Sequence, residues 1–153
     1  MDILLGTALG TMIAFVLAIP AILLETSRRV KDLPLLIDVH LWHGKKLNEG
    51  EVFAIGLFVH LLVGALYGCL YVLFAEEGWL FVTNDPYSLQ SLLVFAFFAW
   101  ILVNVVVMPI IGVGVFGRFE GKGAWFETLV SLALEGLTLW VLVQFYQPYY
   151  FMI

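Results

Sequence analysis

Three long runs without a charged residue set the limits on what this chain can fold into. They cover 3–24, 52–75 and 86–117. Because an α-helix rises about 1.5 Å per residue and satisfies its own backbone hydrogen bonds, roughly 20 apolar residues cross the hydrocarbon core of a bilayer as a helix. Each run is long enough to do so, and the third must also include some loop. A fourth apolar stretch follows, interrupted by Glu127 and Glu135.

The chain is therefore predicted to be an all-α integral membrane protein, a four-transmembrane-helix bundle in a single domain, 1–153. The expected spans are 3–25, 51–75, 88–115 and 125–146. The composition is 63% hydrophobic and 12% charged, with a mean hydropathy of +1.03, which is more apolar surface than a water-soluble domain can bury. The lipid bilayer is thus the first expected partner. The single cysteine, Cys69, excludes an internal disulfide and a multi-thiolate metal site.

All seven basic residues lie in two predicted loops, 26–50 and 117–124. Cytoplasmic loops carry the excess of Lys and Arg, so these loops are expected in the cytoplasm and both termini outside, in the cytoplasmic membrane of a prokaryote. Basic side chains beside a membrane surface attract lipid headgroups. The candidates are Arg28, Arg29, Lys45, Lys46, Arg118 and Lys122. The seven residues form no extended basic patch, so a nucleic-acid partner is not expected.

An internal similarity relates the second predicted helix to the fourth. FVHLLVGALYG, 58–68, matches FETLVSLALEG, 126–136, at five of eleven positions. The first and third helices also share a proline, Pro20 or Pro109, eight or nine residues before an arginine. One interpretation is a duplication that makes two parallel-repeat helical hairpins related by an axis along the membrane normal. The general likeness of apolar membrane hairpins explains the match equally well.

Small residues at four-residue spacing mark one face of each of the first two helices. The stripe on the first helix consists of Gly6, Gly10, Ala14 and Ala18, and the stripe on the second of Gly56, His60, Gly64 and Gly68. Lipid gives helices no hydrophobic reason to associate, so close backbone approach at small residues is the expected contact. We predict that the first two helices pack through these faces, with Thr7 and Thr11 adding interhelical hydrogen bonds. A homodimer seam is the alternative.

Polar residues lie deep in three of the predicted spans. The fourth helix carries Thr128, Ser131, Glu135 and Thr138 on one face, the second carries His60 and the third Asn104. Counted at 1.5 Å per residue from the basic end of each span, His60, Glu135 and Asn104 lie roughly 13, 15 and 16 Å deep, at one level. A bare carboxylate there costs about 2.5 kcal/mol or more, so Glu135 should be protonated, paired or facing water.

His60 is the expected partner of Glu135, with Asn104 completing a network. Three interpretations of this cluster, which also includes Thr128 and Ser131, stay open: a polar contact that fixes helix positions, a proton or solute site, and a cofactor ligand. The last needs a second buried histidine for haem iron, and His40 and His43 lie in a loop. Neither a cofactor nor a metal is therefore expected.

The segment 33–44 in the first loop is apolar and precedes two lysines, which is typical of an interfacial segment. A short helix is the expected structure, although the alternation of Ile37, Val39 and Leu41 would suit a strand. His40 and His43 with Asp38 are a weak metal motif, and an ordinary loop is the favoured interpretation. The glycine-rich stretch 112–123 lacks the Ser or Thr that a phosphate-binding Walker loop needs after Lys122.

No signature of a known enzyme mechanism is present, so catalytic residues are not assigned and the chain is predicted to be no enzyme. The pattern resembles, in a generic way only, small prokaryotic four-helix membrane proteins of unknown function, which implies no activity. The first hypothesis is an accessory or structural subunit, or a self-assembling bundle, within a homodimer or larger membrane complex. The alternative is a small proton-linked transporter or channel using His60, Asn104 and Glu135. A lipid-modifying enzyme using His40, His43 and Arg118 is the weakest hypothesis.

Overall fold

The computed structural model describes residues 2–26, 39–79, 85–121 and 123–150. The predicted mostly helical architecture is confirmed. The elements are α1 (Ile3–Thr26), β1 (Leu41–Trp42), β2 (Lys45–Lys46), α2 (Glu49–Glu76), α3 (Leu89–Leu102), the π-helix η1 (Val103–Val107), α4 (Met108–Ile110), the 3₁₀-helix η2 (Val115–Gly117) and α5 (Ala124–Tyr150).

Four helical stretches are long and apolar enough to cross a membrane, as predicted. They are Ile3–Leu23, Glu49–Glu76, Leu89–Ile110 and Ala124–Phe145. The third includes α3, η1 and α4 and ends at Ile110, so the predicted end at 115 is wrong. Pro109 lacks the N–H that would bond to Val105, and the helix widens before it, where Met108 N–H donates to Val103 O, five residues back. The positive φ angles of Gly112 and Gly114, +91° and +79°, then turn the chain.

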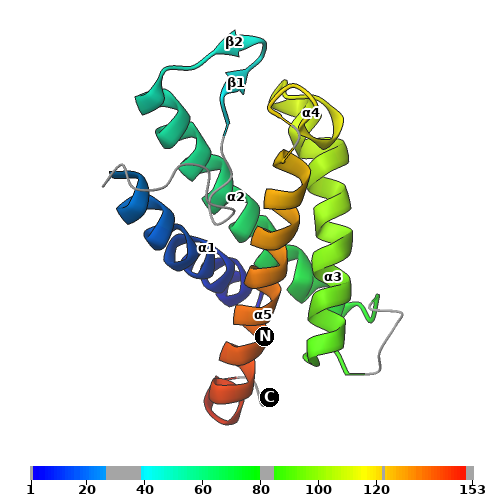
Figure 1. Ribbon diagram of the computed structural model, residues 1–153. Coiled ribbons are helices and arrows are strands. Elements are labelled where there is room, and N and C mark those ends of the chain that lie inside the picture. The colour runs from blue at the N-terminus through cyan, green and yellow to red at the C-terminus, as the bar shows by residue number, and fades with distance from the viewer. Residues whose placement is uncertain (1, 27–38, 80–84, 122, 151–153) are drawn as a thin grey trace.

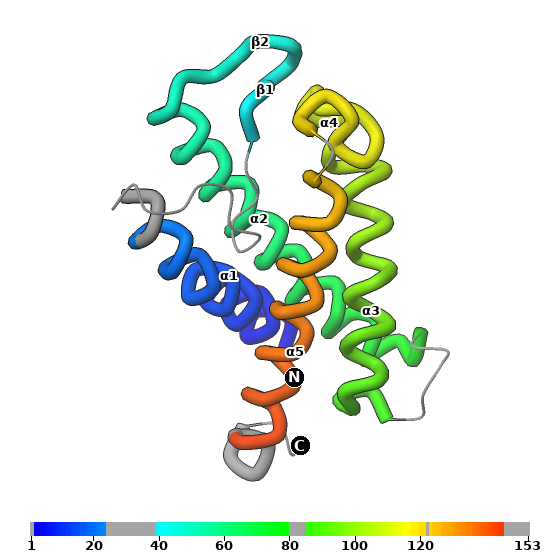
Figure 2. The backbone as a smooth tube through the Cα atoms, viewed as in Figure 1, coloured from blue at the N-terminus to red at the C-terminus, as the bar shows by residue number. Residues whose placement is uncertain are grey.

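The four long helices form two antiparallel hairpins, α1 with α2 and α3 with α5 (Figures 1 and 2). The start of α1, the end of α2, the start of α3 and the end of α5 lie at one end of the molecule, which we call the terminal end. The β1–β2 hairpin and the 111–123 turn lie at the other, which we call the loop end. Asn48 caps α2 at the loop end, because its Oδ1 accepts from Glu51 N and Glu51 Oε2 accepts from Asn48 N.

The α1–α2 seam is built on glycine. A Cβ on Gly10 would collide with the carbonyl oxygen of Gly64, and a Cβ on Gly68 with the carbonyl oxygen of Gly6. The two backbones therefore touch where side chains would otherwise separate them. Gly56, the remaining member of the stripe on α2, is buried. Thr7 and Thr11 donate to carbonyls of their own helix, so the interhelical bonds predicted for them are wrong.

The second hairpin meets the first through the approach of α5 to α1 and through aromatic side chains of α2 and α3. Phe95 on α3 packs edge-on against three rings of α2, with centroid distances of 5.1 Å to Tyr67, 5.1 Å to Tyr71 and 5.4 Å to Phe74. Large rings hold two helices farther apart than glycines do. The α2–α3 contact is consequently wider than the α1–α2 seam.

The outer surface of the candidate spans is apolar, unlike that of a water-soluble protein. Phe98 and Phe145, both within candidate spans, are 61% and 74% exposed, whereas His60, Asn104 and Glu135 are 2%, 0% and 2% exposed. These three polar side chains therefore lie within a mostly apolar core, and large apolar side chains face outward.

The loop end includes a two-residue β-hairpin in which Leu41 pairs with Lys46 and Trp42 with Lys45. His43 and Gly44 form the turn with φ angles of +48° and +79°, the left-handed conformation of both central residues in a type I′ turn. The short helix expected over 33–44 is therefore wrong for 41–44. The positions 33–38 lie outside the described residues.

Candidate functional site

A junction of α1, α2 and α5 contains two buried ionisable side chains, His60 and Glu135. The Nε2 atom of His60 lies 3.0 Å from the carbonyl oxygen of Ala14 on α1. A carbonyl can only accept, so Nε2 carries the hydrogen and donates it. In a neutral ring Nδ1 is then an acceptor, and it has no partner among the described residues.

Glu135 reaches the same junction from α5. Its Oε1 lies 3.0 Å from the point that a Cβ on Gly64 would occupy, and that Cβ would also contact Ala14. The missing side chain of Gly64 thus leaves room for the carboxyl group. Within the described part of the chain, Oε1 of Glu135 is buried without a hydrogen-bond partner.

The predicted hydrogen bond between His60 and Glu135 is wrong, since no such bond forms. The glycine seam explains why: it brings the α1 backbone so near α2 that the Ala14 carbonyl is within reach of the imidazole. The two side chains nevertheless share their neighbours, because Ala14 accepts from His60 and adjoins the gap at Gly64 that Glu135 enters.

Asn104 belongs to a second polar cluster, within the α3–α5 hairpin. Its Nδ2 donates to Thr128 Oγ1 at 3.0 Å and to Trp100 O at 2.9 Å, and Thr128 donates to Trp125 O at 3.0 Å. The predicted network joining Asn104 to His60 and Glu135 is therefore wrong. Asn104 Oδ1 is buried without a partner in the described structure, and Ser131 is buried on α5.

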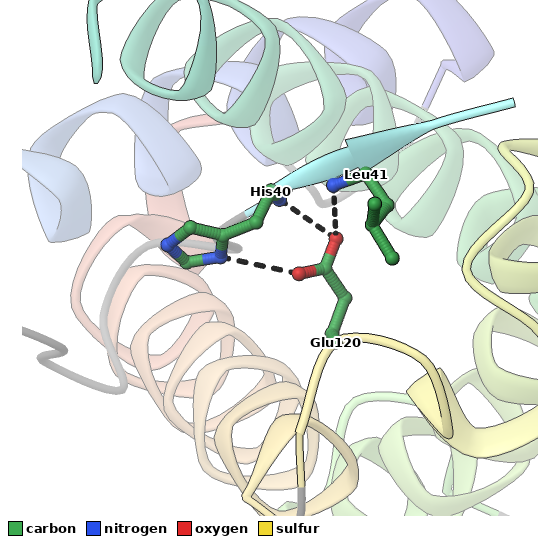
Figure 3. Close-up of polar contacts among 3 residues, drawn as sticks. All are labelled: His40, Leu41 and Glu120. Atoms are coloured by element: carbon green, nitrogen blue, oxygen red, sulfur yellow. Dashed lines mark hydrogen bonds and ion pairs between the residues drawn. The ribbon is translucent and has the colours of Figure 1, made fainter. Parts of the chain in front are cut away.

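The loop end contains another buried carboxylate, Glu120, which the sequence analysis missed (Figure 3). Its Oε1 accepts from the backbone N–H of His40 at 2.7 Å and of Leu41 at 2.8 Å, and its Oε2 lies 3.1 Å from His40 Nδ1. The side chain is 4% exposed. Together with the bond from His43 N to Ile111 O, 3.1 Å, Glu120 fastens the β-hairpin to the 111–123 turn. The sequence distinguishes Glu120 in one way: it is the sole acidic residue of that glycine-rich turn.

The two histidines of the weak metal motif, His40 and His43, make different contacts. His40 uses Nδ1 for Glu120, and the ring of His43 packs edge-on against Trp42. Asp38 lies outside the described residues. Of the candidate headgroup ligands, Lys45, Lys46 and Arg118 are exposed at the loop end, whereas Arg28, Arg29 and Lys122 lie outside the described residues.

An apolar groove of about 460 Å³ lies between α2 and α3 and touches Leu132 of α5. Neither His60 nor Glu135 is among its lining residues. The ionisable junction and the groove are therefore separate features of the molecule.

Comparison with protein-family models, with curated proteins and with solved structures finds no match to this chain. Its function is consequently inferred from its own residues and their contacts.

Proposed function

We propose that this chain is a small, non-enzymatic integral membrane protein that serves as an accessory or structural subunit of a membrane complex. The observation that carries the proposal is the apolar outer surface: large apolar side chains are exposed over four long helices, while His60, Asn104 and Glu135 are buried between them. In lipid this arrangement places His60, Asn104 and Glu135 away from hydrocarbon. We propose further that both basic loops lie in the cytoplasm and both termini outside a prokaryotic cytoplasmic membrane, which the concentration of all seven basic residues in those two loops supports.

A structural role is supported by the packing of the polar residues. Asn104 of η1 donates to Thr128 of α5, and His60 of α2 donates to the backbone of α1. These contacts fix helix positions in a medium where apolar packing alone is not selective. The large groove passes neither His60 nor Glu135, so it offers these groups no aqueous route.

The test combines membrane extraction with isolation in mild detergent. We expect the chain to stay with the membrane pellet after alkaline carbonate washing and to elute with another membrane protein in fixed stoichiometry. The double variant H60Q/E135Q should keep both properties, since neither side chain bonds to the other. Release of the wild-type chain by carbonate, or elution of the wild type as an isolated chain, would contradict the proposal.

A second candidate function, proton-linked transport, is favoured by one observation. His60 Nδ1 and Glu135 Oε1 are both buried and unpartnered in the described structure. Their side chains share Ala14 as a neighbour, because His60 bonds to its carbonyl and Glu135 Oε1 lies in the gap at Gly64 that Ala14 adjoins. Buried polar atoms in native proteins are nearly always paired, and an intramembrane ionisable group commonly handles protons or ions. A protonated Glu135 that turned toward Nδ1 would donate to it, so the pair offers two positions for one proton.

Transport is tested in proteoliposomes containing a pH-sensitive dye. Proton flux above that of protein-free vesicles, lost in E135Q and in H60Q, would support this second function. T138S is the matched control, because Thr138 lies on the same helix but bonds to its own backbone at Leu134. Flux equal to that of empty vesicles at every pH would exclude proton transport and leave the structural role.

A further inference from the structure

The groove between α2 and α3 is long. On α3 and the helix that continues it, the lining runs from Ser91 to Val107, which at 1.5 Å per residue is a length of about 24 Å. Its volume is about 460 Å³. The groove is therefore long enough for an extended hydrocarbon chain to lie along it.

The groove is open along one side and apolar throughout. Its rim residues Leu66, Phe98 and Leu102 are 44%, 61% and 47% exposed. Three lining side chains carry a polar atom: Tyr67, Ser91 and, at the terminal end, Trp79. Both hydroxyls are used internally, because Tyr67 donates to Leu92 O at 3.2 Å and Ser91 donates to Asp85 O at 2.7 Å. The occupant therefore needs no polar group within the groove, which is the property of a hydrocarbon chain.

The terminal end of the groove has acidic and aromatic side chains that would attract a positively charged headgroup. Trp79 lines the groove, is 49% exposed and packs edge-on against Phe74 at 5.3 Å. Glu76 and Glu77, just before it, are exposed, and Lys and Arg are absent from the described residues of this end. Burial raises the pKa of nearby Tyr87, and the negative charge of Glu76 raises it further. Carboxylates and an exposed indole both attract ammonium groups.

We propose that the groove binds one acyl chain of a glycerophospholipid whose ammonium headgroup, that of ethanolamine, lies beside Trp79 and Glu76. The chain runs along α3 toward Val107 and fills the space that the aromatic contacts at Phe95 leave between the hairpins. The inference rests on the proposed insertion of this protein into a membrane. It adds a ligand and a site to that proposal.

Native mass spectrometry of the full chain tests the site. The protein is released from micelles that hold equal amounts of phosphatidylethanolamine and phosphatidylglycerol with identical acyl chains. We expect wild-type protein to retain the ethanolamine lipid several-fold more than the glycerol lipid. A99F places a ring in the groove and should reduce total bound lipid several-fold. A8F is the matched control, because Ala8 is an exposed alanine of α1 and does not line the groove.

Two further variants keep the test decisive. V94F fills the same groove from another lining position and replaces A99F if that variant loses its helical circular dichroism. E76Q/E77Q should retain total lipid but bring the ratio of the two lipids close to one. Equal lipid retention by wild type, A8F and the groove variants would overturn the proposal, as would a dimer that A99F dissociates.

The two proposals fail in different ways. Release of wild-type protein from membranes by carbonate would remove the membrane function and the lipid site together. Firm membrane retention with no difference between A99F and A8F would overturn the lipid site alone.

Discussion

Two carboxylates with buried side chains, Glu120 and Glu135, differ in how many hydrogen bonds they accept. Glu120 at the loop end, with a side chain 4% exposed, accepts from two backbone N–H groups and faces an imidazole nitrogen. Glu135, 2% exposed inside a candidate span, has an Oε1 without a partner in the described structure. One carboxylate is saturated with contacts and the other is not.

The hydrogen bonds of a buried carboxylate show whether the fold itself accounts for its burial. Glu120 joins segments about 80 residues apart in the sequence, and its hydrogen bonds explain its burial. Nothing comparable explains Glu135, whose carboxyl enters a gap made by Gly64 and touches the α1–α2 seam. A buried acid whose Oε1 has no such bonds is the observation that favours the second candidate function, proton-linked transport.

The largest effect is expected from closing the gap that admits Glu135. G64A places a methyl group against Ala14, the Gly10 carbonyl and Glu135 Oε1, and the backbone atoms among these cannot move aside. We expect a loss of about 2–3 kcal/mol in the free energy of unfolding, measured by titration from mild detergent into dodecyl sulfate.

The matched control is G50A, in the first turn of α2. There the nearest atom to the new methyl group is Asn48 Oδ1 at 3.5 Å, an ordinary contact. Alanine should stabilise this exposed helical position by about 0.5–1 kcal/mol. Equal shifts in the two variants would show that the junction is not closely packed.

The saturated carboxylate should be the next most sensitive position. E120A leaves the N–H groups of His40 and Leu41 without their acceptor, which should cost about 1–3 kcal/mol and speed hydrogen exchange at both amides. E120Q is the control, since its amide oxygen can still accept from both groups. Unchanged exchange in E120A would show that the hairpin is held by its other contacts.

A smaller loss is expected from removing the imidazole of His60. H60F deletes the hydrogen bond to Ala14 O, but that carbonyl keeps its partner within α1, so the cost should be about 0.5–1 kcal/mol. The infrared amide band of ¹³C-labelled Ala14 should move to higher frequency, while the band of labelled Ala8 stays in place. An unmoved Ala14 band would contradict the hydrogen bond.

The sequence predicted the features that depend on local pattern. The length of the apolar runs predicted the four long helices. The four-residue spacing of small residues predicted the faces where Gly6, Gly10, Gly64 and Gly68 come together. The repeat alignment stays a prediction, although its paired glycines have similar surroundings: Gly68 faces Gly6 near the start of α1, and Gly136 faces Leu92 near the start of α3.

The partners of the polar residues could not be predicted, because most of them are backbone atoms. A pattern of side chains cannot show that His60 finds the Ala14 carbonyl or that Glu120 finds two N–H groups about 80 residues away. The His43–Gly44 turn was missed since His-Gly is not one of the favoured type I′ pairs. The groove results from the spacing of whole hairpins, which no single segment encodes.

The smallest change in the free energy of unfolding is expected at Glu135. This change tests the contrast with Glu120 most directly. E135L and E135Q remove no hydrogen bond to Oε1, and leucine replaces a polar group in an apolar setting by one of similar size. We expect the free energy of unfolding to stay within about 0.5 kcal/mol of wild type or to rise by about 1 kcal/mol, in the same titration that shows the loss in E120A. A loss above about 1 kcal/mol would instead make Glu135 a structural residue like Glu120. Unchanged stability together with altered proton flux would show that the Glu135 carboxyl takes part in proton transport, since the fold does not depend on it.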